Sequence, residues 1–323
     1  MAEEKSVRKR FDFKEFFFQW EFILVIILIG IFIMNSSLSP NFLRVQTFLN
    51  APMSFLDKAF MVLPMTFVLL LGKIDISVGS TVALSAVALG LSYQAGLPMI
   101  LAIMVALLVG TLAGFINGFL ITRYHELPSM ILTLGTLTLY RGLSYILLEN
   151  QSISGFPDWF QTLGWGYIGS VPIMFIVFAL FAAFFIILMH KTAFGREISA
   201  IGFNERTSKY SGIKVNKRII ITFTMMGFMA AVTALFLASR MSSVRADIAV
   251  GYELEVIAMV VLGGVSTSGG VGKMVGPVIA VFIIGFLRYG LGLINVSSQV
   301  ITMIIGVLLI GSVLVTKFKI NRK

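Results

Sequence analysis

The sequence lacks cysteine, carries only two histidines, and has few charged residues, which make up 12% of its 323 residues. The absence of cysteine excludes disulfide bonds and thiolate chemistry. The scarcity of charge excludes an ordinary soluble domain, in which about 25% of residues are charged and about 45–50% are apolar. In this chain 58% of residues are hydrophobic. A soluble core of this length could not bury them all, so the solvent of this chain is lipid.

The hydrophobic residues form long continuous runs, which predict membrane-spanning helices of about 20 residues. The alternating pattern of roughly 10-residue strands that is typical of membrane barrels is missing. The predicted fold class is therefore an all-α polytopic membrane protein with about ten transmembrane helices in two weakly repeated halves. The predicted spans are 22–38, 55–71, 76–94, 98–121, 128–148, 171–189, 219–238, 254–269, 274–294 and 298–316.

The formal net charge of +10 has two interpretations. In a soluble protein it would suggest nucleic acid as a partner, but the positive-inside rule explains it better here. With both termini in the cytoplasm, most of the 25 Lys and Arg residues lie inside. The exceptions are Arg44, Lys58, Arg240 and Arg245 outside, and Arg141 and Arg288 within spans. We therefore expect no nucleic-acid partner and a multi-pass protein of the cytoplasmic (inner) membrane.

This orientation predicts a simple domain organisation. A cytoplasmic tail at 1–21 precedes a single transmembrane domain at 22–316, and a short cytoplasmic tail follows at 317–323. Several connections between spans are very short, which favours a compact bundle without a separate soluble domain.

No catalytic motif is found. The nearest approach to a phosphate-binding loop is TSGGVGKM at 267–274, which has Thr267 in place of its first glycine and Met274 in place of its hydroxyl residue. The predicted spans hold few of the titratable groups that acid–base catalysis requires. We predict no enzyme activity, no metal and no cofactor, so ATP hydrolysis, if any drives this protein, belongs to a separate subunit.

Two glycine-interrupted segments resemble each other: LLLGKIDISVGSTVAL at 69–84 and VVLGGVSTSGGVGKMV at 260–275. When Gly72 is aligned with Gly263, Gly79 meets Gly270. Matching interruptions in the two halves of a transporter indicate its pathway, although glycine and serine also recur by chance in membrane turns. The pathway or hinge residues predicted here are Asp75, which would lie in a turn at the inner face, and Ser77, Gly79, Gly263, Gly264, Ser268 and Gly270.

Arg141 and Arg288 are the two charges within the spans. Because an arginine facing lipid is costly, each is expected to face the bundle interior or to extend outward along its helix. One interpretation is a polar vestibule near the outer face that meets a hydroxyl-rich solute, and the other is helix packing. The run GTLAGFING places Gly110, Gly114 and Gly118 on one helical face, which predicts close internal packing, with a homodimer seam as the alternative.

The stretch MHKTAFGREISAIGFNERTSKYSGIKVNKRII, 189–220, is polar and basic between two apolar runs. Gly195 is predicted to end the incoming span, and Gly202 to take the left-handed position after a short helix. Asn204 is predicted to cap a second short helix that Gly212 ends. Such a pair of helices favours docking into a partner's groove, whereas a merely solvated basic loop is the alternative. The candidate contact residues in this loop, 190–218, are Gly195, Arg196, Gly202, Asn204, Glu205, Arg206, Lys209 and Gly212.

Three landmarks carry a family resemblance. LGKIDISVGSTVALSA at 71–86 resembles the GGIDLSVGS signature of sugar-type ABC importer permeases, and the loop at 194–218 is similar to that family's cytoplasmic loop. The stretch at 242–273, SSVRADIAVGYELEVIAMVVLGGVSTSGGVGK, resembles its third landmark. The resemblance covers about 50–315, and permeases for ribose, rhamnose and autoinducer-2 are the most similar. The chain departs from the pattern at Lys73, where glycine is usual, and at 206–209, where small residues are common.

The resemblance implies a ten-span permease that pairs with a second permease copy, as a homodimer or a heterodimer. It also implies two ABC ATPase subunits below the membrane and an extracytoplasmic sugar-binding protein above it. The loop around Glu205–Gly212 would then be the helix through which the ATPases act, and the solute would be a monosaccharide or a sugar-like compound. From the residues alone, an ion-coupled secondary transporter and a non-transporting receptor or scaffold remain alternatives.

Overall fold

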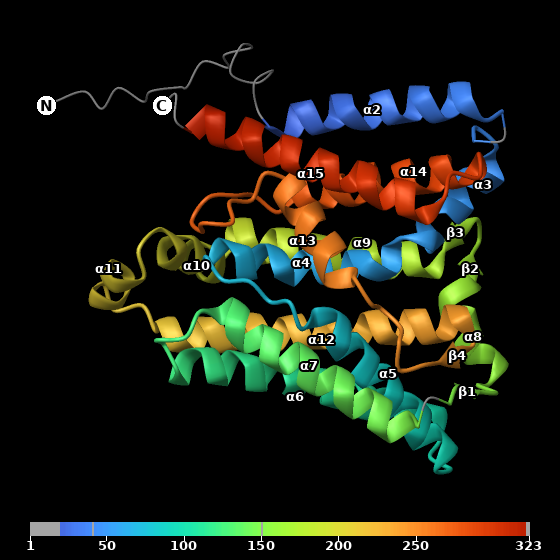
Figure 1. Ribbon diagram of the computed structural model, residues 1–323, viewed down its shortest axis with the longest axis horizontal. Coiled ribbons are helices and arrows are strands. Elements are labelled where there is room, and N and C mark those ends of the chain that lie inside the picture. The colour runs from blue at the N-terminus through green and yellow to red at the C-terminus, as the bar shows by residue number, and fades with distance from the viewer. Residues whose placement is uncertain (1–19, 41, 150, 321–323) are drawn as a thin grey trace, which may run out of the picture.

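The computed structural model describes residues 20–40, 42–149 and 151–320, so residues 1–19 of the predicted N-terminal tail and residues 321–323 of the predicted C-terminal tail lie outside the described residues. Residues 317–320, predicted as tail, belong to the last helix. The long helices run roughly along one axis of an elongated bundle (Figure 1). The helices are α2 (Trp20–Leu38), α3 (Val45–Asn50), η1 (Ala51–Ser54), α4 (Leu56–Leu70), α5 (Val78–Gln94), α6 (Met99–Arg123), α7 (Ser129–Leu148), α8 (Asp158–Trp165), α9 (Ile173–Lys191), α10 (Ala193–Phe203), α11 (Glu205–Tyr210), α12 (Val215–Met241), α13 (Tyr252–Leu262), α14 (Val275–Leu293) and α15 (Ser298–Ile320).

A helix is found at the position of each predicted span, and the chain is confirmed as predominantly helical. Six of the described helices are long and apolar enough to cross a membrane: α2, α6, α7, α9, α12 and α14. A seventh span results if α3, η1 and α4 are counted as one helix with a 55° bend. Length and composition therefore support six to seven spans among the described residues, fewer than the ten predicted.

The span predicted at 254–269 is wrong in its extent. Its helix, α13, has only 11 residues and ends at Leu262. At 1.5 Å per residue such a helix is about 16 Å long, roughly half the thickness of the hydrocarbon core. The cause is local, because Gly264 adopts φ +86° and ends the helix in a left-handed turn.

The core is centred on α4, in which every residue is buried. Around it pack α12, α13, α14 and α9. The outer faces of the peripheral helices carry exposed apolar side chains, such as Ile146 on α7 and Leu180 on α9. This arrangement of a buried central helix and apolar outer faces is the one expected where lipid surrounds the bundle.

The predicted packing face on α6 is confirmed as an internal contact with α12. A Cβ atom at Gly110 would lie 2.7 Å from the Cβ of Ala231, and one at Gly114 would lie 2.8 Å from the Cα of Gly227. A Cβ atom at Gly118 would lie 2.8 Å from the Cα of Ile220. Since these glycines face α12, they do not form a homodimer seam.

The two ends of the bundle differ. At one end lie α8 and four two-residue strands, β1 (Ile153–Ser154), β2 (Tyr167–Ile168), β3 (Val171–Pro172) and β4 (Ser243–Val244). They form two antiparallel pairs, β1 with β4 and β2 with β3. At the opposite end, on the left in Figure 1, lie α10, α11 and the end of α15. We call this the α10–α11 end.

Candidate functional site

The chain between α4 and α5 is not helical, and it returns into the bundle. In Figure 1, α4 reaches the α10–α11 end, whereas α5 begins near the middle of the bundle's length. The backbone N–H groups of this extended segment need partners in an apolar environment. Side-chain hydroxyls of α7 supply them: Ser129 Oγ accepts from the Ile74 nitrogen at 3.1 Å, and Thr133 Oγ1 accepts from the Ile76 nitrogen at 3.2 Å.

Asp75 was expected in a turn at the inner face, but it is buried, with 2% of its surface exposed. Its Oδ1 accepts hydrogen bonds from the backbone nitrogen of Ser77 at 2.9 Å and from the Ser77 hydroxyl at 2.7 Å. The amide of Asn117 donates to Ser77 Oγ at 2.7 Å, and the Tyr140 hydroxyl donates to Asn117 Oδ1 at 3.3 Å. Asp75 therefore anchors a polar chain that ties the start of α5 to α6 and α7.

The two glycine-interrupted segments begin with the same helix-ending turn, but the predicted alignment is wrong by one residue, so that Gly79 no longer meets Gly270. Gly72 follows α4 with φ +67°, and Gly264 follows α13 with φ +86°. After α4, the Lys73 nitrogen donates to the Val68 carbonyl at 3.1 Å; after α13, the Val265 nitrogen donates to the Val260 carbonyl at 3.3 Å. Both ends are thus the same glycine-terminated motif, and Gly72 corresponds to Gly264 instead of Gly263.

The two repeated segments contact each other and α10. The Gly270 nitrogen donates to the Leu70 carbonyl at 2.8 Å. A Cβ atom at Gly202, near the end of α10, would overlap both that Leu70 oxygen and the Gly270 nitrogen. A Cβ atom at Gly269 would lie 2.8 Å from the Gly72 nitrogen. We call Leu70, Gly72, Gly202, Gly269 and Gly270 the glycine junction.

The expected turns of the basic loop are confirmed in part. Asn204 caps α11, since its Oδ1 accepts from the Thr207 nitrogen at 2.9 Å, and Gly212 follows α11 with φ +84°. The expectations for Gly195 and Gly202 were wrong, because both lie inside α10. Gly195 is required because a Cβ atom there would overlap the Met189 carbonyl, and Gly202 is required by the glycine junction.

The surface of α11 is polar, basic and aromatic. Arg206 and Lys209 are exposed on α11, as Arg196 is on α10. Tyr210 is 93% exposed, an unusual position for a large aromatic ring, and sequence reasoning did not single it out. Glu205 is the exception on this surface, because its Oε2 lies 3.6 Å from Lys73 Nζ.

The other predicted residues of the second segment lie around the turn after α13. Gly263 is buried against α14, where a Cβ atom would overlap the backbone of Pro277. Gly264 faces the ring of Trp20, whose Nε1 donates to the Leu262 carbonyl at 2.9 Å. Ser268 is exposed. These residues therefore fix the end of α13 and the turn that reaches the glycine junction.

The two intramembrane arginines have different partners. Arg141, on α7, donates through Nη1 to the carbonyls of Ala246 at 2.6 Å and Ile248 at 2.8 Å, in the loop that precedes α13. Arg288, on α14, donates through Nη2 to Glu255 Oε1 at 2.9 Å. Both guanidinium groups are thus hydrogen-bonded. Arg288 fixes the first turn of α13, and Arg141 fixes the loop that precedes α13.

The sequence of this chain matches known membrane transport proteins along most of its length. A family model described as "Branched-chain amino acid transport system / permease component" matches residues 48–313. This chain belongs to that permease family. The ribose import permease protein RbsC of Bacillus subtilis (strain 168) is 40% identical to this permease over 300 residues, which cover 92% of this chain and 91% of the relative.

Two further relatives carry the name autoinducer 2 import system permease protein LsrD. The one from Klebsiella pneumoniae subsp. pneumoniae is 33% identical over 310 residues, or 94% of this chain and 93% of the relative. The one from Escherichia coli (strain K12) is 35% identical over 311 residues, or 94% of each chain. No solved structure matches the permease.

The permease also contains an ion-pair network that sequence reasoning missed. Asp57, at the start of α4, is fully buried, and its Oδ2 lies 3.0 Å from Arg240 Nη2 of α12. The hydroxyl of Tyr252, the first residue of α13, donates to the same oxygen at 3.3 Å. Arg240 was expected in a loop outside the membrane, but the structure places its charge against a buried carboxylate.

A second carboxylate continues this network. Glu255 of α13 accepts from Lys58 Nζ at 2.6 Å on one oxygen and from Arg288 on the other. The Lys58 ammonium also lies 4.4 Å from the centre of the Tyr252 ring, a cation–π contact. Lys58 is therefore buried instead of exposed in an outside loop. The network joins the first turn of α13 to α4, α12 and α14, and no sequence spacing signals pairs so far apart in the chain.

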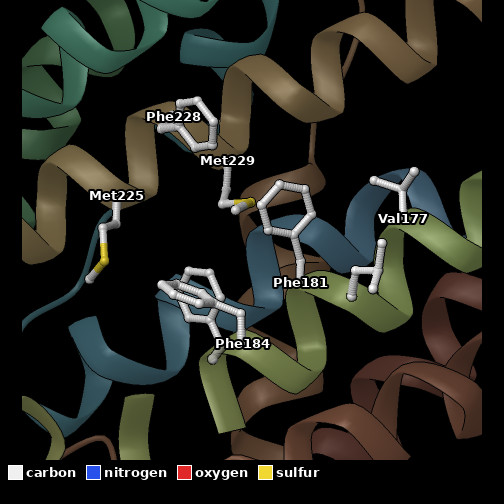
Figure 2. Close-up of a pocket in the computed structure, with 8 residues that line it drawn as sticks. Val177, Phe181, Phe184, Met225, Phe228 and Met229 are labelled. Atoms are coloured by element: carbon white, nitrogen blue, oxygen red, sulfur yellow. The ribbon is translucent and has the colours of Figure 1, made fainter. Parts of the chain in front are cut away.

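Figure 2 shows an apolar cavity of about 510 Å³ between α9 and α12. Its lining includes Phe181 and Phe184 from α9 and Met225, Phe228 and Met229 from α12. A hydroxyl-rich solute would find almost no hydrogen-bonding group there and would lose its hydration without compensation. This cavity is therefore unsuited to such a solute.

Proposed function

We propose that this chain is the membrane permease subunit of an ABC importer for a monosaccharide or sugar-like solute of the ribose, rhamnose or autoinducer-2 type. The names of relatives that match more than nine-tenths of the chain support this assignment. The permease itself is not an enzyme, and two ABC ATPase subunits supply the energy. An extracytoplasmic binding protein delivers the solute to a permease dimer, which is either homomeric or heteromeric.

We further propose that the α10–α11 end lies in the cytoplasm and that the broken helices complete a ten-span topology in the inner membrane. The end of α15 lies at this same end (Figure 1). Basic residues gather there as well, including Arg196, Arg206 and Lys209. Such a concentration of lysine and arginine is typical of the cytoplasmic side of a membrane protein.

One observation carries the mechanism: α11 projects from the end of the bundle, while α10 is locked to the interior through the glycine junction. The contacts of Gly202 with Leu70 and Gly270 are backbone contacts without room for a side chain. Close-packed backbones transmit displacement because they leave no void to absorb it. A push on α11 therefore moves the end of α4 and the turn after α13 together.

In this mechanism the ATPases bind the exposed surface of α11, where Arg206, Lys209 and Tyr210 are accessible to a partner. ATP binding closes the ATPases and displaces α11. The glycine junction passes the displacement to both interrupted segments, and the bundle alternates between outward-open and inward-open states. The hinge role is assigned to the extended segment that holds Asp75, Ser77 and Gly79 and to the turn that holds Gly263, Gly264, Ser268 and Gly270.

The test is a charge reversal on α11 in the complete importer reconstituted into proteoliposomes. Glu205→Lys combined with Arg206→Glu is expected to leave the permease in the membrane and to uncouple ATP hydrolysis from uptake. Because Glu205 also pairs with Lys73, a triple variant that adds Lys73→Glu restores that internal pair without restoring the surface offered to the ATPases. Uncoupling that persists in the triple variant supports the ATPase contact. Unchanged uptake in the double variant would refute it.

A further inference from the structure

We infer that Arg141, Tyr145 and Glu253 form a solute-contact site for an uncharged, hydroxyl-rich compound, where α7 meets the loop before α13. This inference rests on the proposed function, because it names the surface within the permease that the solute touches. The apolar cavity of Figure 2 does not suit such a solute, so the contact surface must be sought where polar side chains meet inside the bundle.

The first reason is the Glu253 carboxylate. Glu253 lies in the first turn of α13 and is half-buried. In Figure 1, α13 lies near the middle of the bundle's length. Its neighbour in the same turn, Glu255, is paired with two cations, whereas within the described residues the Glu253 carboxylate has neither a hydrogen bond nor an ion pair. A lone carboxylate at this depth is costly unless it faces water or a solute.

The second reason is the position of Glu253 beside the interrupted segment that begins α5. A Cβ atom at Gly79 would lie 2.5 Å from Glu253 Oε2 and 2.6 Å from the Ala249 carbonyl oxygen. Any other residue at position 79 would therefore push the carboxylate away. The place where two helices begin inside the bundle, α5 and α13, is typical of a transporter's substrate site.

The third reason is a stripe of polar side chains on one face of α7. Thr138, Arg141 and Tyr145 are three and four positions apart, so they share one helical face. Thr138 and Tyr145 are exposed, the latter by 39%, and Arg141 is half-buried. Arg141 donates to the Ile248 carbonyl. The next residue, Ala249, lies with Glu253 beside Gly79, so the stripe and the carboxylate belong to one neighbourhood.

The charges of this neighbourhood select the class of solute. Arg141 donates to two backbone carbonyls through Nη1, and Arg245 is paired with Asp247 at 2.8 Å. Because backbone carbonyls are neutral, the positive charge of Arg141 remains, and it balances the negative charge of Glu253. The site is thus neutral overall, which favours an uncharged solute over a phosphorylated sugar. A carboxylate accepts hydrogen bonds from sugar hydroxyls, and an aromatic ring such as that of Tyr145 packs against the apolar face of a sugar ring.

The absence of cysteine from the chain provides a direct test of access. Glu253→Cys and Tyr145→Cys are made singly, and the permease is treated in the complete importer with a charged, water-soluble methanethiosulfonate. Modification of the permease chain is read by mass spectrometry. Leu180→Cys, on the exposed apolar face of α9, and Thr66→Cys, in the fully buried α4, are the matched controls.

We expect both site variants to react at least about tenfold faster than both controls, because the reagent needs water and a thiolate. If Glu253→Cys reacts no faster than Thr66→Cys, no aqueous path reaches the carboxylate and the site is refuted. The rate of labelling does not depend on transport of the solute. Fast labelling in an importer that moves no sugar would refute the proposed function and leave the aqueous path in place.

The solute class is tested by uptake. D-Ribose, L-rhamnose and D-ribose 5-phosphate are offered to proteoliposomes, and the neutral sugar that enters fastest is then used with Glu253→Gln. We expect the phosphate ester to be rejected and the KM of the variant for the neutral sugar to rise about tenfold, the effect of one weakened charge-assisted hydrogen bond. Entry of the phosphate ester at the rate of the sugars, or an unchanged KM, would overturn the assignment.

Discussion

The backbone nitrogen of Gly270 donates a hydrogen bond to the carbonyl oxygen of Leu70, and the two atoms lie 2.8 Å apart. This bond joins the turn after α13 to the last turn of α4, although the two residues are far apart in the chain. Gly202 of α10 is packed against both of its atoms. The region that we assign to the ATPase contact and the two repeated segments therefore meet at a single point.

The glycine junction makes Gly202→Ala the most informative single substitution. The added methyl group would overlap the Leu70 oxygen and the Gly270 nitrogen, so α10 must shift away from the bundle. We expect the number of solute molecules imported per ATP hydrolysed to fall about tenfold, within the range of coupling free energies in proteins. Binding of the ATPases, measured by co-purification, should persist.

The matched control is Gly30→Ala on α2, where no heavy atom lies within 4 Å of the added carbon. It should leave uptake and hydrolysis unchanged. Normal coupling in Gly202→Ala would show that the junction does not transmit the displacement.

A second prediction concerns the packing of α6 against α12. A Cβ atom at Gly114 would lie 2.8 Å from Gly227 and would also overlap the Phe223 carbonyl oxygen. Overpacking of a close-packed contact typically costs about 1–3 kcal/mol. Gly114→Ala should therefore lower the melting temperature of the purified permease in detergent. Gly306→Ala on α15, where nothing lies within 4 Å, should not. Equal melting temperatures for the two variants would contradict the close approach of these helices.

Hydropathy located the helices well, and local chemistry located some of their ends. The Asn204 cap was predictable because it depends on residues three positions apart, as was the turn at Gly212. The reason for Gly202 was not predictable, because its neighbours Leu70 and Gly270 come from other parts of the chain. The buried ion pair of Asp57 and Arg240 was not predicted for the same reason.

The two glycine-interrupted segments show a further limit of prediction from sequence. Two adjacent glycines, Gly263 and Gly264, compete for alignment with Gly72, and only the backbone angles decide between them. Likewise, nothing in the sequence indicated that Asp75 is buried, since the same short polar run could form a solvated turn. Asn117, which donates to the Ser77 hydroxyl that bonds Asp75, lies on α6, where the sequence suggested only a glycine packing face.

The Asp57–Arg240 pair predicts a large effect on stability. Asp57→Asn leaves the Arg240 guanidinium without its charged partner, and the exposed fractions of the two side chains are only 0% and 18%. Breaking a buried pair on one side typically costs about 3–5 kcal/mol. The variant should accumulate poorly in the membrane and melt early.

Lys273→Gln provides the contrast, because Lys273 is 56% exposed where it pairs with Glu21. An exposed pair is worth about 0–1 kcal/mol, so this variant should melt close to the wild type. If both variants melt at the wild-type temperature, the charges of Asp57 and Arg240 do not stabilise each other.

Arg141 and Arg288 should respond differently to substitution by alanine. Arg288→Ala removes one of two cations from Glu255, so we expect loss of melting temperature and membrane abundance. Arg141→Ala frees the carbonyls of Ala246 and Ile248 and so loosens the loop that positions Glu253. Its main effect should be on uptake, with a rise in KM and near-normal abundance, because that loop lies outside the buried ion pairs. Uptake kinetics and melting curves measured on the same two preparations separate these roles. Parallel losses in both variants would mean that Arg141, like Arg288, serves only to hold the bundle together.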